Sequence, residues 1–346
     1  MPKKNTHILL IYTGGTIGMK LCPETDSLVP FDFSLISEEV PELTKSGYSI
    51  DSYSFDPVID SSDVSLSFWQ ELARIIETNY DRYDGFVVLH GTDTMSYSAS
   101  ALSFMLQNLE KPVVFTGSQL PIGMLRTDGK ENLISAIEIA SERDSEGHPI
   151  VPEVVIYFDS KLYRGNRTTK FSAENFRAFR SPNAPVLADI GIHIKYNTDV
   201  IRHPKTWGNP LTVNYALDSN VAVLKIFPGI SRKAIEAITH TEGLRALVIE
   251  TFGSGNAPTS KMFLECISEA IERGIIVLNI TQCVTGTVDM DAYATGKALQ
   301  RLGVINGLDS TTEAATTKLF FLLGQYTDNE KVKELLPLNL AGEITK

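Results

Sequence analysis

The chain has 346 residues, of which 43% are hydrophobic and 21% are charged, as in ordinary folded proteins. Because this length exceeds what one hydrophobic core usually serves, we expect two domains. The formal net charge of -11 would repel nucleic acids and anionic lipids at long range, so neither a nucleic acid nor a membrane is an expected partner.

The first predicted element is a buried strand at residues 8–12, an apolar run that ends directly before the motif T-G-G-T-I-G at residues 13–18. Open α/β sheets bind ligands at the carboxyl ends of their strands, and Gly14 and Gly15 permit close approach of a ligand to the backbone. The motif matches neither the dinucleotide fingerprint nor the P-loop. A tight turn without a chemical role is the alternative interpretation of these six residues alone.

Helices and strands then alternate up to residue 158. The segment at residues 19–30, here called the lid segment, contains two prolines and no clear periodicity, so we expect a mobile loop. Helical spacing of apolar residues and short apolar runs predict the elements that follow it. We expect helices at residues 68–76, 94–108 and 132–140 and strands at residues 86–89, 112–115 and 154–158. This alternation predicts parallel βαβ units with helices on both faces of the sheet.

Prolines and weak periodicity interrupt this pattern between residues 181 and 220, and a second α/β series follows. We expect its strands at residues 221–226, 246–250 and 275–280 and its helices at residues 231–239, 260–273, 292–301 and 311–325. The sequence therefore predicts an α/β fold of two domains. The larger N-terminal domain, residues 1–190, has a mainly parallel sheet flanked by helices, residues 191–220 form a linker, and residues 221–346 form a smaller C-terminal α/β domain.

A second hydroxyl-rich motif, H-G-T-D-T-M at residues 90–95, follows the predicted strand at residues 86–89. It would share the crevice at the carboxyl edge of the sheet with the first motif. Asp93 could cap the next helix, or it could bind a cationic group while Thr92 shares in a proton network. A lone histidine without paired carboxylates is usually a packed or hydrogen-bonded residue, so we assign His90 no catalytic role.

A third motif is the cationic run at residues 161–170, which ends at Lys170. A solvated loop is the default interpretation, because neither interleaved aromatic residues nor an overall positive charge indicates nucleic-acid binding. The alternative is that Lys170 is partly buried in the crevice, where it exchanges a proton with a hydroxyl group. Because a threonine oxygen is a poor nucleophile without such help, a relay of Thr92, Lys170 and Asp93 would supply the missing activation.

Cysteine usage and the apolar runs indicate the compartment. Cys22, Cys266 and Cys283 are odd in number and widely spaced, which does not fit a disulfide framework or a C-x-x-C metal site. The apolar run behind Lys3 and Lys4 is about five residues long, below the roughly 7–15 of a signal-peptide core. No stretch approaches the ~20 apolar residues of a membrane span. We therefore expect a cytoplasmic protein.

Five motifs, in this order, resemble those of the bacterial cytoplasmic type I L-asparaginases. They are T-G-G-T-I-G, D-S-S-D at residues 60–63, H-G-T-D-T-M, R-G-N-R-T-T-K at residues 164–170 and G-S-G-N at residues 253–256. The similarity covers essentially the whole chain. The two threonine motifs together are specific to the asparaginase/glutaminase family, which includes relatives that act on glutamine and an archaeal tRNA-amidotransferase subunit. The resemblance implies a hydrolase that converts L-asparagine to L-aspartate and ammonia without a metal or a cofactor.

The resemblance also implies catalytic roles for particular residues. Thr16 matches the nucleophile, which attacks the side-chain amide and forms an acyl-enzyme that water then opens. Thr92, Asp93 and Lys170 match the proton-relay triad of the family.

Substrate-binding positions are implied in the same way. Ser61 and Ser62 match residues that hold the α-carboxylate and α-amino group of the substrate, with Asp60 beside them. Asp93 would also bind the ammonium, and the backbone carbonyl of Ser118 would receive the leaving amide. Asn256 resembles a residue that reaches into the active site of a neighbouring subunit. A homodimer is then the minimum functional unit, and a homotetramer remains an alternative.

Two positions depart from the family pattern. Leu28 occupies the place of a lid tyrosine that is thought to help activate the nucleophile, so Lys170 or Tyr293 would have to act instead. Glu250 stands where cooperative members have an arginine that serves, with a cysteine like Cys283, a second asparagine site. Since a carboxylate there would repel the ligand, we expect weak or absent substrate activation. A glutaminase or broader amidase, and a non-catalytic amino-acid-binding protein, remain alternative functions.

Overall fold

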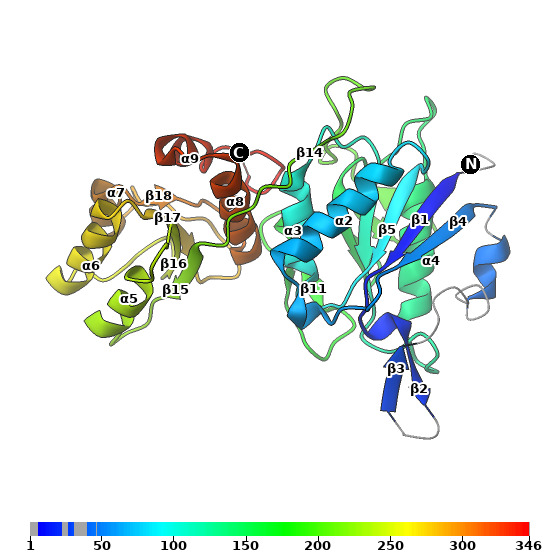
Figure 1. The fold of residues 1–346 in the computed structure, drawn as a ribbon, viewed down its shortest axis with the longest axis horizontal. Coiled ribbons are helices and arrows are strands. Elements are labelled where there is room, and N and C mark those ends of the chain that lie inside the picture. The colour runs from blue at the N-terminus through cyan, green and yellow to red at the C-terminus, as the bar shows by residue number, and fades with distance from the viewer. Residues whose placement is uncertain (1–5, 23–26, 31–39, 46, 346) are drawn as a thin grey trace. The chain divides into compact units, whose positions relative to one another are not determined.

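The computed structural model describes residues 6–22, 27–30, 40–45 and 47–345, and the chain divides into two compact units (Figure 1). The first unit extends to Ser181 and also contains Pro185–Asn214. The second contains Pro182–Ala184 and the chain from Tyr215 onward. Both units are α/β structures, as the sequence predicted.

The first unit is built on a sheet that has eight strands among the described residues. Its order is β13-β12-β9-β8-β7-β5-β1-β4. Strands β8, β7, β5, β1 and β4 are parallel to one another, and β9, β12 and β13 extend the sheet with antiparallel pairing. The strands are β1 (His7–Tyr12), β4 (Ser49–Ser54), β5 (Gly85–Leu89), β7 (Val113–Thr116), β8 (Val154–Phe158), β9 (Lys161–Arg164), β12 (Ala188–Ile190) and β13 (Ile194–Tyr196). The expected mainly parallel sheet is therefore confirmed.

Helices cover both faces of this sheet, α2 (Leu66–Asn79) and α3 (Met95–Met105) on one and α4 (Gly129–Ser141) on the other (Figure 1). Strand β1 shows why both faces need cover. Its Leu10 lies in the core cluster with Leu133 and Ile137 of α4. The neighbouring Leu9 and Ile11 are also buried. A strand that is apolar on both faces is stable only between two layers, because either exposed face would leave apolar surface in water.

Several short elements occupy the segments between these layers. Over its described part, the lid segment forms an antiparallel hairpin of β2 (Met19–Cys22) and β3 (Ser27–Pro30), so the expectation of an irregular loop is wrong for these residues. Lys20 interrupts the apolar residues of β2, and β3 has only two apolar residues before Pro30, so neither strand shows the continuous apolar run that predicted the buried strands. Two further short pairs are β10 (Thr169–Lys170) with β11 (Phe179–Arg180) and β6 (Leu106–Gln107) with β14 (Thr212–Val213). The 3-10 turns are η1 (Thr16–Gly18), η3 (Pro41–Lys45), η4 (Ser61–Asp63) and η5 (Gly165–Arg167).

The second unit contains a smaller parallel sheet in the order β15-β16-β17-β18. Helix α8 covers one face and α5 to α7 cover the other (Figure 1). Ser231, Ser260 and Thr311 accept backbone N–H bonds at the starts of α5, α6 and α8, the usual role of a hydroxyl side chain at that position. The elements are β15 (Val221–Lys225), α5 (Arg232–Thr239), β16 (Ala246–Thr251), α6 (Lys261–Glu272), β17 (Ile276–Thr281), α7 (Ala294–Leu302), β18 (Ile305–Asn306), α8 (Thr312–Gln325) and α9 (Asn329–Leu335).

The division between the units falls inside the segment that we expected to be a linker, residues 191–220. Pro185–Asn214 belong to the first unit, because the β12–β13 hairpin extends its sheet and Ile201 packs in its core. Tyr215 begins the second unit. None of the helices in the described part of the chain is long and apolar enough to cross a membrane.

Candidate active site

The first hydroxyl-rich loop starts where β1 ends. The backbone N–H and the hydroxyl of Thr13 both donate to the carbonyl of Leu89, at 3.0 and 2.9 Å, which joins the end of β1 to the end of β5. The chain then passes through Gly14 and Gly15 to Thr16, the first residue of η1, which is half-buried. The expected nucleophile therefore lies at the carboxyl edge of the sheet, close to the start of the second motif.

Glycines bring three of the sequence motifs into direct contact. Gly14 has φ 134°, and a Cβ there would lie 2.2 Å from the carbonyl oxygen of Ile59. Gly15 has φ 88°, and its Cβ would lie 2.6 Å from the Cα of Gly91. A Cβ on Gly91 would in turn lie 2.5 Å from Oγ of Ser61. Because only glycine fits these contacts, the T-G-G-T, H-G-T-D and D-S-S-D segments meet through the glycines themselves.

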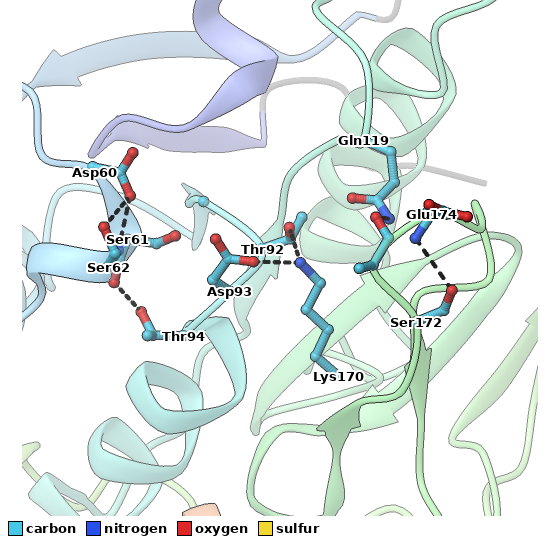
Figure 2. Close-up of polar contacts among 12 residues, drawn as sticks. Asp60, Ser61, Ser62, Thr92, Asp93, Thr94, Gln119, Lys170, Ser172 and Glu174 are labelled. Atoms are coloured by element: carbon cyan, nitrogen blue, oxygen red, sulfur yellow. Dashed lines mark hydrogen bonds and ion pairs between the residues drawn. The ribbon is translucent and has the colours of Figure 1, made fainter.

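Lys170 joins the second motif to the third. Its Nζ donates to Oγ1 of Thr92 at 2.9 Å and to Oδ1 of Asp93 at 2.5 Å (Figure 2). The lysine side chain is 18% exposed and that of Asp93 is 66% exposed, so the amine lies in a recess while the carboxylate faces solvent. The pairing of β10 with β11 holds Lys170 in place. Lys170 is thus hydrogen-bonded to both of the other residues of the expected proton relay.

The D-S-S-D segment forms η4, and Asp60 caps it. Oδ1 of Asp60 accepts from the N–H and from the hydroxyl of Ser62, both at 2.8 Å. These two bonds lower the pKa of Asp60, so the carboxylate stays ionised at neutral pH. Ser61 is buried, and its carbonyl accepts from Oγ1 of Thr94 at 2.6 Å, which fixes the segment against the second motif (Figure 2).

Ser118 lies in the loop that follows β7. Its side chain is buried, and its hydroxyl donates to the carbonyl of Leu120 at 2.5 Å. The amide of Asn132 donates to the carbonyl of Gly117 at 2.9 Å, so both sides of Ser118 are tied down. In Figure 2, Lys170 and its contacts lie between Asp60 on the left and Gln119 on the right. The expected role of the Ser118 carbonyl at the leaving amide stays a prediction.

The remaining expected residues lie in other parts of the chain. Asn256 belongs to the second unit, where its Oδ1 accepts from the Thr295 hydroxyl, and Tyr293 is 57% exposed in the same unit. Leu28 lies on β3, but its side chain is outside the described residues. Glu250 accepts from Oγ1 of Thr312 at 2.6 Å. No described contact joins these residues to Thr16, so their roles stay predictions.

His90, to which the sequence assigned no catalytic role, lies beside the candidate site. It is buried between the rings of Phe68 and Phe115, with centroids 5.5 and 5.9 Å away. Its Nδ1 lies 2.6 Å from the carbonyl oxygen of Gly91, and its Nε2 lies 2.9 Å from Oγ of Ser98. The histidine is packed and hydrogen-bonded, as we expected, and its contacts extend to the loop that carries Thr92. In the sequence, the only sign of these contacts was a histidine directly after the apolar run of β5.

Electrostatics and metal-binding potential can be stated for the described residues. Burial lowers the pKa of His90 to about 4, so its imidazole is neutral at physiological pH. Within the described part of the chain, no group of three or more His, Cys, Asp or Glu side chains could hold a metal ion. The polar groups that converge here are hydroxyls, one amine, carboxylates and backbone amides.

Comparison with known proteins assigns the family. Residues 7–202 match the family described as "Asparaginase, N-terminal", and residues 220–336 match "Glutaminase/Asparaginase C-terminal domain". The chain belongs to the asparaginase family. Within the family it is 44% identical to L-asparaginase 1 of Escherichia coli strain K12, with 100% of this chain and 99% of that protein covered.

Two further members illustrate the range of the family. The mouse protein named 60 kDa lysophospholipase is 40% identical, and the match covers 98% of this chain but only 62% of that protein. The crystal structure of L-asparaginase I from Vibrio cholerae superposes with a TM-score of 0.90 at 41% identity, covering 99% of this chain and 100% of that chain. The asparaginase fold therefore extends over the whole chain.

Proposed function

We propose that this protein hydrolyses L-asparagine to L-aspartate and ammonia through an acyl-enzyme on Thr16. The observation that carries the proposal is the contact of the Lys170 amine with both Thr92 and Asp93. The close packing of Gly15 against Gly91 holds the loop of Thr16 next to the loop that carries these two residues. Full-length similarity to L-asparaginase 1 of E. coli supports the choice of substrate.

The proposed reaction has two steps. In the first, the Thr16 oxygen attacks the side-chain amide carbon, the C–N bond breaks, and ammonia leaves with the proton that the hydroxyl gave up. In the second, water opens the ester, which releases aspartate and restores the hydroxyl. Proton transfer uses Thr92 and Lys170, since the amine contacts the hydroxyl at 2.9 Å. The Asp93 carboxylate, at 2.5 Å, accepts a hydrogen bond from the same amine and so orients it.

Recognition of the substrate follows from the polar groups around this relay. A free amino acid carries an ammonium and a carboxylate, so its site needs an anion for one and hydrogen-bond donors for the other. Asp93 and the ionised Asp60 provide the anions. Since the Ser62 hydroxyl already donates to Asp60, its lone pairs are available to accept from the ammonium. Ser61 and nearby backbone N–H groups then hold the carboxylate.

The remaining parts of the proposal concern assembly and location. Asn256 lies in the second unit and is proposed to complete the active site of a neighbouring subunit, which makes a homodimer or a homotetramer the active form. The protein is proposed to be cytoplasmic and to need no cofactor. Analytical ultracentrifugation distinguishes the two assemblies, and a monomer with full activity would overturn the role of Asn256.

Activation of Thr16 is proposed to come from Lys170 or Tyr293, because Leu28 replaces the lid tyrosine of the family. Glu250 is proposed to prevent a second asparagine from binding. Its carboxylate accepts a hydrogen bond from Thr312 and lies 3.7 Å from Nζ of Lys225, so these contacts hold the side chain in position.

The decisive experiment measures initial ammonia release from L-asparagine and L-glutamine in parallel, from about micromolar to tens of millimolar substrate, the range that brackets usual KM values. Turnover of asparagine with glutamine far behind supports the proposal. Equal turnover of the two substrates supports a broader amidase. Glutamine has one methylene more than asparagine, and such a difference changes the discrimination between two substrates by only about 1–3 kcal/mol. Binding without turnover of either substrate overturns the enzymatic role in favour of an amino-acid-binding protein.

A further inference from the structure

His90 is a buried polar group that the proposed reaction does not use. It follows β5 directly and precedes the residues that contact Lys170. Its side chain is 1% exposed, and the aromatic rings of Phe68 and Phe115 lie against it. Because burying an unpaired ring nitrogen is costly, both nitrogens of a buried histidine need partners.

The partners of His90 determine where its proton lies. A carbonyl oxygen only accepts, so the nitrogen that contacts the Gly91 carbonyl, Nδ1, carries the hydrogen. In the neutral ring Nε2 is then an acceptor, and the Ser98 hydroxyl donates to it. The Ser98 oxygen accepts in turn from the indole N–H of Trp69 at 2.9 Å, since an indole nitrogen only donates. The hydrogen bonds therefore run in one direction, from Trp69 through Ser98 and His90 to Gly91.

This chain of bonds ends on the peptide group between Gly91 and Thr92. A trans peptide is planar, so its carbonyl and its N–H point in opposite directions. Once His90 holds the Gly91 carbonyl, the Thr92 N–H is turned away from the buried ring. The Cα of Gly91 is itself packed closely, because a Cβ on Gly91 would lie 2.5 Å from Oγ of Ser61 and a Cβ on Gly15 would lie 2.6 Å from the Cα of Gly91.

The Thr92 N–H has no hydrogen-bond acceptor among the residues that the structure describes. It belongs to the residue whose hydroxyl contacts Lys170. An oriented backbone donor at the carboxyl edge of the sheet is suited to an oxygen that becomes negative during acyl transfer, because its direction is set before the reaction begins.

We propose that His90 is a positioning residue, which aims the Thr92 N–H at the developing oxyanion by holding the Gly91 carbonyl through Nδ1–H. The proposal rests on the proposed function, since it assigns this donor to the amide-cleavage step. It also makes Ser98 and Trp69 indirect contributors, because they keep Nε2 as the acceptor and so keep the hydrogen on Nδ1.

Two matched variants test this assignment. In His90→Asn, the amide nitrogen is attached to Cγ, as Nδ1 is in histidine, so it can still donate to Gly91. In His90→Gln, the amide group lies one bond farther out and corresponds to Nε2. Both replacements are neutral amides, so they differ mainly in where the donor lies.

We expect His90→Gln to lower kcat for asparagine by about 10²–10³, the usual effect of losing one oxyanion donor, with KM changed by less than about threefold. His90→Asn should keep kcat within about tenfold of the wild-type enzyme. Thermal unfolding of both variants shows whether they are equally folded. Equal losses of kcat in the two variants, or an effect on KM alone, would overturn the proposal.

A measurement on the wild-type protein does not depend on activity. Imidazole ¹⁵N chemical shifts, with the His90 signal assigned through its bonds from the backbone resonances of the wild-type protein, should show a neutral ring protonated on Nδ1 at pH 7. A hydrogen on Nε2, or a charged ring, would refute the inference even if the variants fail to fold. If this signal is as expected but the wild-type protein releases no ammonia from any amide, the proposed function and the oxyanion role fail, while the hydrogen-bond network stands.

Discussion

Replacement of Lys170 by methionine should abolish most turnover without unfolding the protein. The perturbation removes one amine that contacts Thr92 at 2.9 Å and Asp93 at 2.5 Å. Methionine keeps an unbranched apolar chain in the recess, where the lysine is only 18% exposed.

The structure separates the effect on stability from the effect on catalysis. Because Asp93 is 66% exposed, its ion pair with Lys170 is a surface pair worth about 0–1 kcal/mol of folding free energy. A positioned acid–base group usually accounts for about 10²–10⁴-fold in rate, which is about 3–5 kcal/mol of activation free energy. The loss of kcat in Lys170→Met should therefore be much larger than the loss that its small change in folding stability could cause.

The assay is kcat for ammonia release at saturating asparagine, with thermal unfolding followed by circular dichroism on the same samples. Lys161→Met is a matched control, because Lys161 on β9 forms an exposed ion pair with Asp189 on β12. It should leave kcat unchanged. Lys170→Arg keeps the charge but exchanges protons poorly, so it should also be inactive. If Lys170→Met retains more than about a tenth of kcat, or changes KM alone, the relay is refuted.

Four further predictions follow from the same geometry. Thr16→Ala should lower kcat at least tenfold while the unfolding temperature stays nearly unchanged. Gly15→Ala should destabilise the protein by about 1–2 kcal/mol from its φ of 88° alone, plus the cost of the contact with Gly91, and should lower activity as the two loops separate. Because burial lowers the pKa of His90 to about 4 while the unfolded chain titrates near 6.5, stability should fall between pH 7 and pH 5, by about 2 kcal/mol more in the wild-type protein than in His90→Asn. Rate curves for asparagine should be hyperbolic, because Glu250 opposes a second bound carboxylate.

Each of these predictions has a measurement that can contradict it. An acyl-enzyme detected by mass spectrometry on a residue other than Thr16 would refute the assignment of Thr16 as the nucleophile. An unfolding midpoint of Gly15→Ala equal to that of the wild-type protein would contradict the close packing. Parallel pH profiles of urea unfolding for the wild-type protein and His90→Asn would refute the titration argument, since only the wild-type chain should bind the extra proton on unfolding. A sigmoidal rate curve would contradict the role given to Glu250.

The sequence alone determined the long helices, the buried strands and the family. The apolar run at residues 154–158 predicted β8 with its observed bounds, and the run at residues 8–12 lies within β1. Strands buried between two helical layers must be apolar on both faces, so they are visible in the sequence without knowledge of their neighbours. The order of the motifs likewise indicated the asparaginase family before any contact was known.

Elements whose side chains face solvent required the structure. The edge strand β4 is mostly exposed, and its residues give no apolar run, so the sequence did not predict it. Strand β9 was missed for a different reason: its buried residues, Leu162 and Tyr163, are flanked by Lys161 and Arg164 in a cationic run, so they form no apolar run of their own. Such strands form because a neighbouring strand offers backbone donors and acceptors, and no pattern in their own side chains records that neighbour.

Only the tertiary structure decided how the candidate site is assembled. Lys170 and Thr92 are 78 positions apart in the chain, and their contact depends on the β10–β11 hairpin and on the end of β5. The fit of Gly15 against Gly91 and the direction of the hydrogen bonds through His90 also depend on atoms from distant segments. A sequence states which groups are present, but the distances between them follow from packing, because each contact is set by residues far along the chain.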